Sequence, residues 1–438
     1  MLERLFHLTA NGTNPRREII AGLTTFAAMS YILAINPDIL SAAGMGKEGL
    51  VTVTALAAGI GTLLMALFTN YPIALAPGMG LNAYFAFTVC GAAGIPWKGA
   101  LAMVFWNGII FLLLSITGLR TKIAESVPPA LKIGVQCGIG LFIAFIGLRN
   151  GGIIVKDNVT FVRLGELSNP STLLVLTGII VTFALVHKKV LGGIIISIFL
   201  VTMIGFEIPK GEGMVTVAPD SIWGLPSGIG ETFFALDILY PITHLSEAWK
   251  VVIALLFVDL FDTIGTLIGV SRQAGLVDAQ DRLPKMGRAL TSDACATIVG
   301  ACLGTSTTTS YIESAAGVQA GGRTGMTSIT IASCFFLALF FGPIIVIIPP
   351  EATAPALVMV GVLMMQGVKN LKFDDLTSLA PAVVTMMIMP LAFSISDGLA
   401  IGFIVYFGTM LLVGKWRKVS LLTAALAILF FFFYVLNL

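Results

Sequence analysis

Long apolar stretches, separated by short polar breaks, follow one another along the whole chain. An α-helix needs about 20 predominantly apolar residues to cross a bilayer. The first half is predicted to contain seven such segments, at Ile19–Leu40, Gly49–Asn70, Ile73–Gly91, Gly99–Thr117, Ala130–Leu148, Ser171–His187 and Val190–Phe206. After a polar connection over residues 207–247, seven more follow at Val251–Val270, Arg288–Leu303, Thr305–Gly317, Thr327–Ile348, Ala354–Gly367, Leu376–Phe393 and Gly398–Val413. The pattern predicts an all-α polytopic membrane protein with 14 transmembrane segments, and a last apolar run at Leu421–Leu436 is either a further span or an interfacial helix.

The composition agrees with this prediction. Of the 438 residues, 57% are hydrophobic and 11% are charged, whereas a soluble globular protein carries about 25% charged residues. The net charge of +2 gives no indication of a nucleic-acid partner. The five cysteines and three histidines form no CxxC pair or HExxH motif, and no Ser/Lys dyad lies in the spans. We therefore expect no metal, no cofactor and no enzymatic activity.

The basic residues are unevenly distributed when the segments are threaded alternately through the membrane. With the N-terminus in the cytoplasm, most of the 25 Lys and Arg residues fall on the cytoplasmic side in both halves of the chain. Cytoplasmic loops of membrane proteins carry such an excess. The beginning of the chain lacks the continuous apolar core of a cleavable signal. We expect a multi-pass protein of the inner cell membrane with a cytoplasmic N-terminus.

The two halves resemble each other at a few positions. The tripeptide Pro129–Leu131 recurs as Pro355–Leu357, and Tyr84 in the third segment matches Tyr311 in the tenth. An odd number of spans separates the matching positions, so the repeats would have inverted topology. The sequence thus predicts two inverted repeats of seven segments each.

The third and tenth segments are both interrupted. Prolines and glycines in Tyr71–Phe85 prevent one continuous helix, and a run of Ser and Thr follows Gly304 in the tenth segment. Each segment is expected to form a short strand and then a half-helix whose N–H groups point toward a central site. Unwound backbone at membrane depth is tolerated only where protein or a cavity satisfies its polar groups. The alternative is that these small residues simply permit close helix packing.

Three carboxylates lie inside apolar segments. Asp259 and Asp262 are three residues apart on one predicted helix, and Glu313 falls in the first turn of the tenth half-helix. No Lys or Arg lies in the same segments, and acidic groups in hydrocarbon are costly, so these positions are candidates for function. The alternative is that they hydrogen-bond neighbouring helices. Asp293 is expected near the cytoplasmic face, paired with Arg288.

The negative charge of these residues restricts the chemical class of ligand that the site can bind. A pocket with carboxylates and no arginine repels anions and suits a cation or a neutral ligand rich in N–H donors. Carboxyl groups in a low-dielectric site can also take up and release protons near neutral pH. Two further acids, Asp38 and Asp397, lie at segment ends and are expected to cap helices.

Four motifs carry a resemblance to a known family. They are AGLTTFAAMSYILAINP near the start, GMGLNAYFAF at Gly78–Phe87, FVDLFDTIGTLIGV at Phe257–Val270 and TSTTTSYIESAAGV at Thr305–Val318. With them the chain resembles the nucleobase–cation symporter-2 superfamily, and in particular its azaguanine-like branch of hypoxanthine/adenine/guanine permeases. The resemblance extends over essentially the whole chain.

The resemblance implies a uracil-permease-like fold, with 14 segments as 7+7 inverted repeats and short strands in segments 3 and 10. A core domain would comprise residues 1–125 and 248–348, a gate domain residues 126–206 and 349–438, and residues 207–247 would connect the halves outside the membrane. It further implies import of purine nucleobases (adenine, guanine and hypoxanthine) by proton symport with an elevator-type movement. Protons would be the coupling ion, and a homodimer through the gate domain is possible.

The resemblance also implies roles for individual residues. The substrate-binding residues would be Asp262, Glu313, Asn82, Phe85, Ile312 and Thr308, and the proton-coupling residues would be Asp259, Asp262 and Glu313. Uracil and xanthine branches usually carry a Glu followed by a histidine in the eighth segment, whereas Thr266 stands here at the second polar position. This difference favours the purine branch. A uracil- or xanthine-type permease on the same fold is the alternative, and a passive channel is the alternative from another class.

Overall fold

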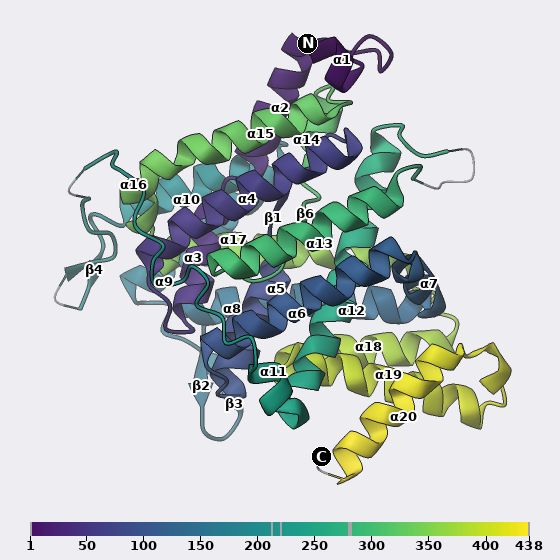
Figure 1. The fold of residues 1–438 in the computed structure, drawn as a ribbon. Helices are drawn as coiled ribbons and strands as arrows, with labels where there is room; N and C mark the ends of the chain where they lie inside the picture. Colours follow the sequence, from purple (N-terminus) through teal and green to yellow (C-terminus); the bar gives the residue numbers. More distant parts are fainter. Residues whose placement is uncertain (1, 212, 220, 279–282, 437–438) are drawn as a thin grey trace.

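The computed structural model describes residues 2–211, 213–219, 221–278 and 283–436 (Figure 1). Within these ranges, nine helical stretches are long and apolar enough to cross a membrane. Four shorter apolar helices accompany them, at Met79–Ala92, Gly193–Ile204, Leu376–Leu391 and Leu421–Val435. The chain is therefore a largely helical, multi-pass membrane protein. Arg282, which the topology prediction places in the cytoplasm, lies outside the described residues.

The elements of the first half are α1 (Leu2–Phe6), α2 (Pro15–Met29), α3 (Ile32–Ser41), α4 (Lys47–Thr69), β1 (Leu75–Pro77), α5 (Met79–Ala83), the π-helix η1 (Tyr84–Ala92), α6 (Trp97–Ile116), α7 (Leu119–Ser126), α8 (Pro129–Asn150), β2 (Ile154–Asp157), β3 (Phe161–Leu164), α9 (Pro170–His187) and α10 (Gly193–Ile204). The elements of the second half are β4 (Pro209–Lys210), β5 (Gly213–Met214), α11 (Tyr240–Thr243), α12 (Leu245–Gln273), α13 (Met286–Leu303), β6 (Thr308–Ser310), α14 (Ser314–Gln319), α15 (Gly325–Ala338), η2 (Leu339–Phe341), α16 (Gly342–Val346), α17 (Pro350–Met364), η3 (Met365–Asn370), α18 (Leu376–Leu391), α19 (Ile395–Leu412), η4 (Trp416–Lys418) and α20 (Leu421–Leu436).

Several helices begin at polar residues that precede the apolar runs. The Asn14 side chain accepts a hydrogen bond from the backbone N–H of Arg17 at 3.0 Å, and Pro15 occupies the first turn of α2. Asn169 and Pro170 start α9 in the same way. These residues satisfy N–H groups that have no partner inside the helix. The sequence therefore sets these helix starts locally.

The two acids expected to cap helices do something else. Asp38 lies inside α3, where it forms an ion pair with Lys47 at 3.5 Å and accepts a hydrogen bond from Thr353 at 2.7 Å. Asp397 lies in the first turn of α19, which Ser394 caps, and it accepts a hydrogen bond from the Tyr434 hydroxyl. The expectation was wrong for both, because Asp38 bonds residues of the neighbouring helices α4 and α17 and Asp397 bonds a residue of α20.

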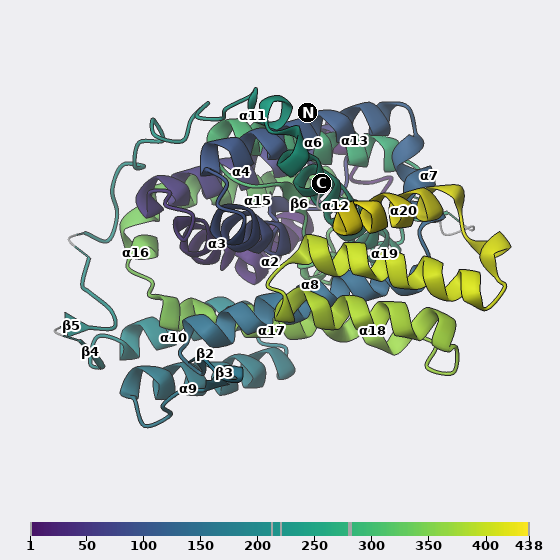
Figure 2. The same cartoon turned by 90° about the horizontal axis from the view of Figure 1, so that it is seen from below.

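The helices form two sets that pack side by side (Figure 2). In the first set, α4 packs against α13 and α15, α6 packs against α13, and α2 packs against α15. In the second set, α8 packs against α17 and α18, α9 packs against α10 and α17, and α18 packs against α19. Helix α12 contacts members of both sets, since it packs against α6, α8 and α19. The chain crosses between the sets at three places, and the short helix α7 makes the first crossing, from α6 to α8.

Glycines allow the helices of the second set to approach closely. A Cβ atom at Gly134 would lie 2.8 Å from the Cα of Ala382 in α18. A Cβ atom at Gly147 would lie 2.8 Å from the carbonyl oxygen of Ala354 in α17. Small residues let membrane helices gain contact area without a steric penalty. Helix α8 is therefore held tightly between α17 and α18.

A two-stranded antiparallel pair lies in the interior of the first set. Strand β1 pairs with β6, with Leu75 opposite Ser310 and Pro77 opposite Thr308, and all six residues are buried. The Thr62 hydroxyl lies 2.9 Å from both the backbone N–H and the carbonyl oxygen of Leu75. These contacts satisfy the backbone polar groups of the interrupted segments, as a site at membrane depth requires.

The positions of strands β1 and β6 give a different alignment of the two interrupted segments from the one predicted from the sequence. Met79 is the second residue after β1, and Ile312 is the second residue after β6. The sequence comparison instead paired Tyr84 with Tyr311, which places the match about two helical turns too late in the first half. Counted from the ends of the two strands, Tyr84 and Tyr311 therefore do not occupy corresponding positions.

Candidate functional site

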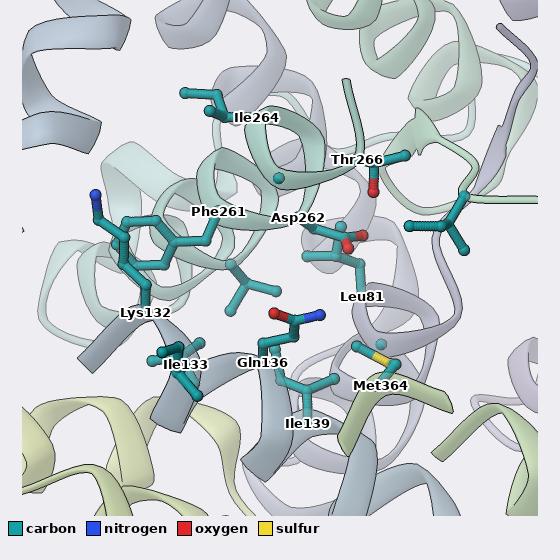
Figure 3. Close-up of a pocket in the computed structure, with 15 residues that line it drawn as sticks. Leu81, Lys132, Ile133, Gln136, Ile139, Phe261, Asp262, Ile264, Thr266 and Met364 are labelled. Carbon is teal, nitrogen blue, oxygen red and sulfur yellow. The ribbon is translucent and has the colours of Figure 1, made fainter. Parts of the chain in front are cut away.

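A cavity lies where the residues after β1 and β6 meet helices α8, α12 and α17 (Figure 3). It consists of two adjoining spaces of about 270 Å³ and 220 Å³. Both spaces are lined by Gly80, Gln136, Asp262, Thr266, Ile312 and Met364. These residues come from both sets of helices, so the cavity lies at the boundary between the sets.

Asp262 supplies a carboxylate to the cavity from α12. Thr266, one turn later, lines the same space because residues four apart share a face of a helix. Asp262 has no ion pair with any Lys or Arg in the described part of the chain, although Lys132 also lines the larger space. An acidic side chain without a basic partner is costly at membrane depth and marks a position kept for function.

Glu313 supplies the second carboxylate, from the turn between β6 and α14. It accepts a hydrogen bond from the hydroxyl of Tyr31. Tyr31 is fully buried at the break between α2 and α3. Sequence reasoning predicted one continuous helix there and did not single out Tyr31, because an apolar run with an aromatic residue gives no local sign of a break.

Gln136 provides the polar group on the opposite side of the cavity. It lies on α8, is exposed to the cavity, and extends its carboxamide toward the space that Asp262 occupies (Figure 3). Around it the wall is apolar, with Ile133, Ile139 and Met364. Sequence reasoning missed Gln136, although a lone amide within the apolar run of α8 was a signal that could have found it.

A second polar cluster, the Arg120 cluster, is buried behind the cavity and comprises Arg120, Asp259, Thr263 and Asp293. A guanidinium nitrogen of Arg120 lies 2.9 Å from Asp293 and 4.0 Å from Asp259, and all three side chains are fully buried. Arg120 also donates a hydrogen bond to the carbonyl oxygen of Leu290 at 3.1 Å. Buried charges persist when they are paired and hydrogen-bonded in this way.

The Arg120 cluster corrects the prediction for Asp293. This residue was expected near the cytoplasmic face with Arg288, but Arg288 is exposed at the start of α13 and Asp293 binds Arg120 instead. Asp259 likewise has Arg120 beside it, so the expectation of acids without a basic partner was wrong for Asp259. The reason is that the fold packs α7, which carries Arg120, against α12 and α13. Arg120 precedes both acids by more than a hundred positions in the chain.

The structure brings three of the predicted site residues together. Asp262 and Ile312 line both spaces, and Glu313 lines the smaller one. Ile312 exposes 57% of its surface and so forms part of the cavity wall.

Four other predicted residues do not line the cavity. Asn82 is buried and accepts a hydrogen bond from Ser306, and Phe85 is packed in the core within η1. Thr308 lies in β6, where its carbonyl oxygen accepts a hydrogen bond from Thr297 at 3.0 Å. Asp259 belongs to the Arg120 cluster.

Comparison with known proteins gives one family. The model of the Permease family matches residues 16–401. The putative permease MJ0326 of Methanocaldococcus jannaschii is 46% identical over 98% of this chain and 97% of its own length. The guanine/hypoxanthine permease PbuO of Bacillus subtilis is 44% identical over 98% of this chain and 99% of its own. The adenine permease AdeQ of Escherichia coli is 40% identical over 98% of this chain and 95% of its own length.

A solved structure shares the fold. The transmembrane domain of the cyanobacterial bicarbonate transporter BicA superposes with a TM-score of 0.65, covering 88% of this chain and 97% of the domain. The two sequences are only 15% identical. The likeness therefore concerns the fold alone.

Proposed function

We propose that this chain, which belongs to the Permease family, is a secondary active transporter that imports purine nucleobases such as adenine, guanine and hypoxanthine. The observation that carries the proposal is the cavity where two interrupted segments meet and where Asp262 and Glu313 form no ion pair with a Lys or Arg of the described residues. The names of two relatives of at least 40% identity, an adenine permease and a guanine/hypoxanthine permease, point to the same ligand class.

The chemistry of a purine fits this cavity. A purine base presents ring N–H and exocyclic amine donors, which the carboxylates of Asp262 and Glu313 accept. The Gln136 carboxamide offers one acceptor and two donors, and so can bond a carbonyl oxygen or ring nitrogen of the base. Ile312 and Met364 provide apolar surface for the faces of the planar ring. Among the described residues, the charged groups that an inorganic anion would find in the cavity lining are the carboxylates of Asp262 and Glu313 and the single cation of Lys132.

The packing of the helices supports two inverted repeats of seven segments. In such a repeat α4 corresponds to α13, α6 to α15, α8 to α17 and α9 to α18. Exchanging each helix for its counterpart turns the α4–α15 contact into the α13–α6 contact, and both contacts are present. The same exchange turns the α8–α18 contact into the α17–α9 contact, and both of these are also present. The α8–α17 contact maps onto itself. In this proposal the first set of helices is the core domain, residues 1–125 and 248–348, and the second set is the gate domain, residues 126–206 and 349–438.

An elevator-type movement follows from the division of the cavity. Asp262 and Glu313 would travel with the core domain, while Gln136 and Met364 stay with the gate domain. Protons would be the coupling ion, with Asp259, Asp262 and Glu313 as the groups that exchange them. The N-terminus would face the cytoplasm across the inner membrane. Exposed apolar side chains such as Ile180 on α9 and Phe199 on α10 would face lipid or a second copy of the gate domain.

Transport by purified protein in liposomes tests the proposal. Labelled adenine, guanine or hypoxanthine should accumulate faster when the vesicles contain unlabelled base, because only a carrier shows such counterflow. Competition with uracil and xanthine separates the purine assignment from the alternative permeases. Asp262→Ala and Glu313→Ala should each abolish uptake while membrane insertion is retained. Normal uptake by either variant would disprove the site.

A further inference from the structure

The Arg120 cluster contains two acids and one base. Arg120, Asp259 and Asp293 are each fully buried, so no water replaces a missing partner. Asp262, on the same helix as Asp259, is a further titratable group that acts on Asp259. With both acids ionised the cluster would carry one uncompensated negative charge in the membrane interior, which is expensive.

Asp293 has the surroundings of an ionised carboxylate. It accepts a charge-assisted hydrogen bond from Arg120 at 2.9 Å. Its Oδ1 and Oδ2 atoms lie 3.1 Å and 3.2 Å from the hydroxyl oxygen of Thr263. Arg120 and Thr263 are therefore both placed to donate to this acid.

Asp259 has much poorer surroundings for a charge. Its Oδ1 atom lies 3.0 Å from the Thr263 hydroxyl oxygen, while Oδ2 has no hydrogen-bond partner. The nearest guanidinium nitrogen of Arg120 is 4.0 Å from Oδ2, beyond hydrogen-bond distance. A neutral carboxyl group tolerates this arrangement better than an ionised one.

The Thr263 hydroxyl group can donate to only one of the two acids, and the shorter distance from Arg120 to Asp293 favours Asp293 as the ionised acceptor. Its oxygen is within 3.1 Å of Asp259 and Asp293, and within 2.8 Å of the hydroxyl oxygen of Thr309. A hydroxyl group has one hydrogen to donate and two lone pairs to accept. Thr263 can donate to Asp293 and accept from Thr309, so the contact with Asp259 becomes a hydrogen bond only when Asp259 carries the donor.

We propose that the Arg120 cluster holds one proton, on Oδ1 of Asp259, and that Arg120 is the positioning residue that fixes it there by keeping Asp293 ionised. The cluster is then neutral, with Arg120 positive, Asp293 negative and Asp259 uncharged, and Thr263 uses all of its hydrogen-bonding capacity. Loss of this proton leaves Arg120 shared between two carboxylates.

The cluster is connected to the transport site at two points. Thr309, which bonds Thr263, also lines the cavity, and Asp262 is the residue before Thr263. Arg120 itself lies on α7, one of the three connections between the two sets of helices. The proton on Asp259 can thus act both on the geometry of the cavity and on the link between the sets. This part rests on the proposed function, whereas the position of the proton does not.

Two measurements on single variants test where the proton lies. Asp259→Asn imitates a neutral Asp259, so the purified variant should unfold at the wild-type temperature. It should retain purine counterflow but lose the stimulation of uptake by an inward proton gradient. Asp293→Asn removes the ionised partner of Arg120 and should lower the unfolding temperature. Equal destabilisation by the two substitutions would overturn the assignment, and this readout does not depend on transport.

Mirrored double variants test the role of Arg120. Arg120→Gln should reduce gradient-driven uptake by roughly tenfold or more, since it leaves a buried carboxylate unpaired. The double variant Arg120→Gln/Asp293→Asn is neutral when Asp259, its remaining acid, holds the proton. It should therefore recover most of the stimulation of uptake by the proton gradient. The double variant Arg120→Gln/Asp259→Asn should recover none of this stimulation. Arg288→Gln, at an exposed arginine on α13, is the matched control and should behave as wild type.

Each other result contradicts the proposal. Recovery by the Arg120→Gln/Asp259→Asn pair would place the proton on Asp293, and failure of both pairs would make Arg120 a purely structural residue. If Arg120→Gln does not fold, the neutral pair with Asp293→Asn should still fold and couple. Absence of purine counterflow in the wild type would disprove the proposed substrate but leave the stability comparison valid.

Discussion

Two acids one turn apart on α12 have opposite surroundings. Asp262 lines the cavity and has no basic partner in the described structure, whereas Asp259 is fully buried beside Arg120 and Asp293. In the sequence the two residues look equivalent, since both are aspartates in an apolar run on one helix. The comparison shows that helical spacing gives only an approximate orientation. The elements packed against the helix determine which acid meets a ligand and which meets an arginine.

The difference also separates function from stability. Groups kept at a binding site without partners cost stability, and replacing them commonly preserves or raises it. Groups inside a satisfied ion pair behave in the opposite way, because removal of one partner leaves the other buried and unpaired. Substitutions in the cavity and in the Arg120–Asp293 ion pair should therefore have opposite effects on stability.

The largest effect is expected at the cavity. Asp262→Asn should reduce purine uptake by roughly 100-fold or more, because hydrogen bonds to a charged group contribute about 1.5–3 kcal/mol each. The unfolding temperature of the purified variant should stay equal to that of the wild type or rise. Uptake into liposomes and thermal unfolding in detergent provide the two measurements. A fall in stability comparable with that of Asp293→Asn would remove the distinction between the regions.

The matching effect in the Arg120 cluster is on stability. Asp293→Ala should destabilise the protein by about 3–5 kcal/mol, the cost of leaving a buried partner unpaired. Thermal or denaturant unfolding measures the change, with Arg288→Gln as the control at an exposed position of the same helix. If Asp293→Ala were as stable as the control, the ion pair with Arg120 would not contribute as the geometry indicates.

A smaller effect is expected at the hydrogen bond that orients Glu313. Tyr31→Phe removes the hydroxyl that donates to Glu313 and keeps the ring in the core. The KM for purine should rise by about tenfold or more, since a hydrogen bond to a charged group is lost. Steady-state uptake over a range of base concentrations measures it. An unchanged KM would show that the carboxylate holds its position without the tyrosine.

A weaker effect is expected on the gate side of the cavity. Gln136→Leu should raise the KM for purine about 2- to 10-fold, the range for loss of one neutral hydrogen bond. Gln273→Leu, at an exposed glutamine near the end of α12, is a suitable control. A loss as large as that of Asp262→Asn would mean that the second set of helices binds the ligand as strongly as the first.

The smallest effect is expected at an acid outside the membrane spans. Hydrogen bonds from the hydroxyls of Thr377 and Ser378 lower the pKa of Asp375 from its ordinary value of 3.8. A lowered pKa in the folded state stabilises the protein above the ordinary value, and the contribution disappears as the pH falls through the folded value. Asp375→Ala should therefore lower the unfolding temperature slightly at pH 7. The difference from wild type should vanish under acidic conditions, and a difference independent of pH would contradict this origin.

The sequence determined the elements of this protein and which of them are irregular. Hydropathy depends on consecutive residues, so most helices lie close to their predicted positions, as α4 and α6 do. Prolines and glycines before Leu81, and the Ser and Thr run before Tyr311, act locally and explain why these two segments are interrupted. The apolar setting of Asp262 and Glu313 drew attention to both, and they line one cavity.

Only the tertiary structure decided which of these residues face each other. Arg120 reaches Asp293 across 173 positions, and Tyr31 reaches Glu313 across 282. Three residues of the family motifs, Asn82, Phe85 and Thr308, are buried and are not among the residues that line the cavity. Gln136 belongs to none of these motifs and lines it. Such relations depend on how whole helices pack, and a local pattern contains no information about the partner's distance in the chain. Local chemistry therefore fixed the helices and their breaks, whereas long-range packing chose the partners of every buried charge.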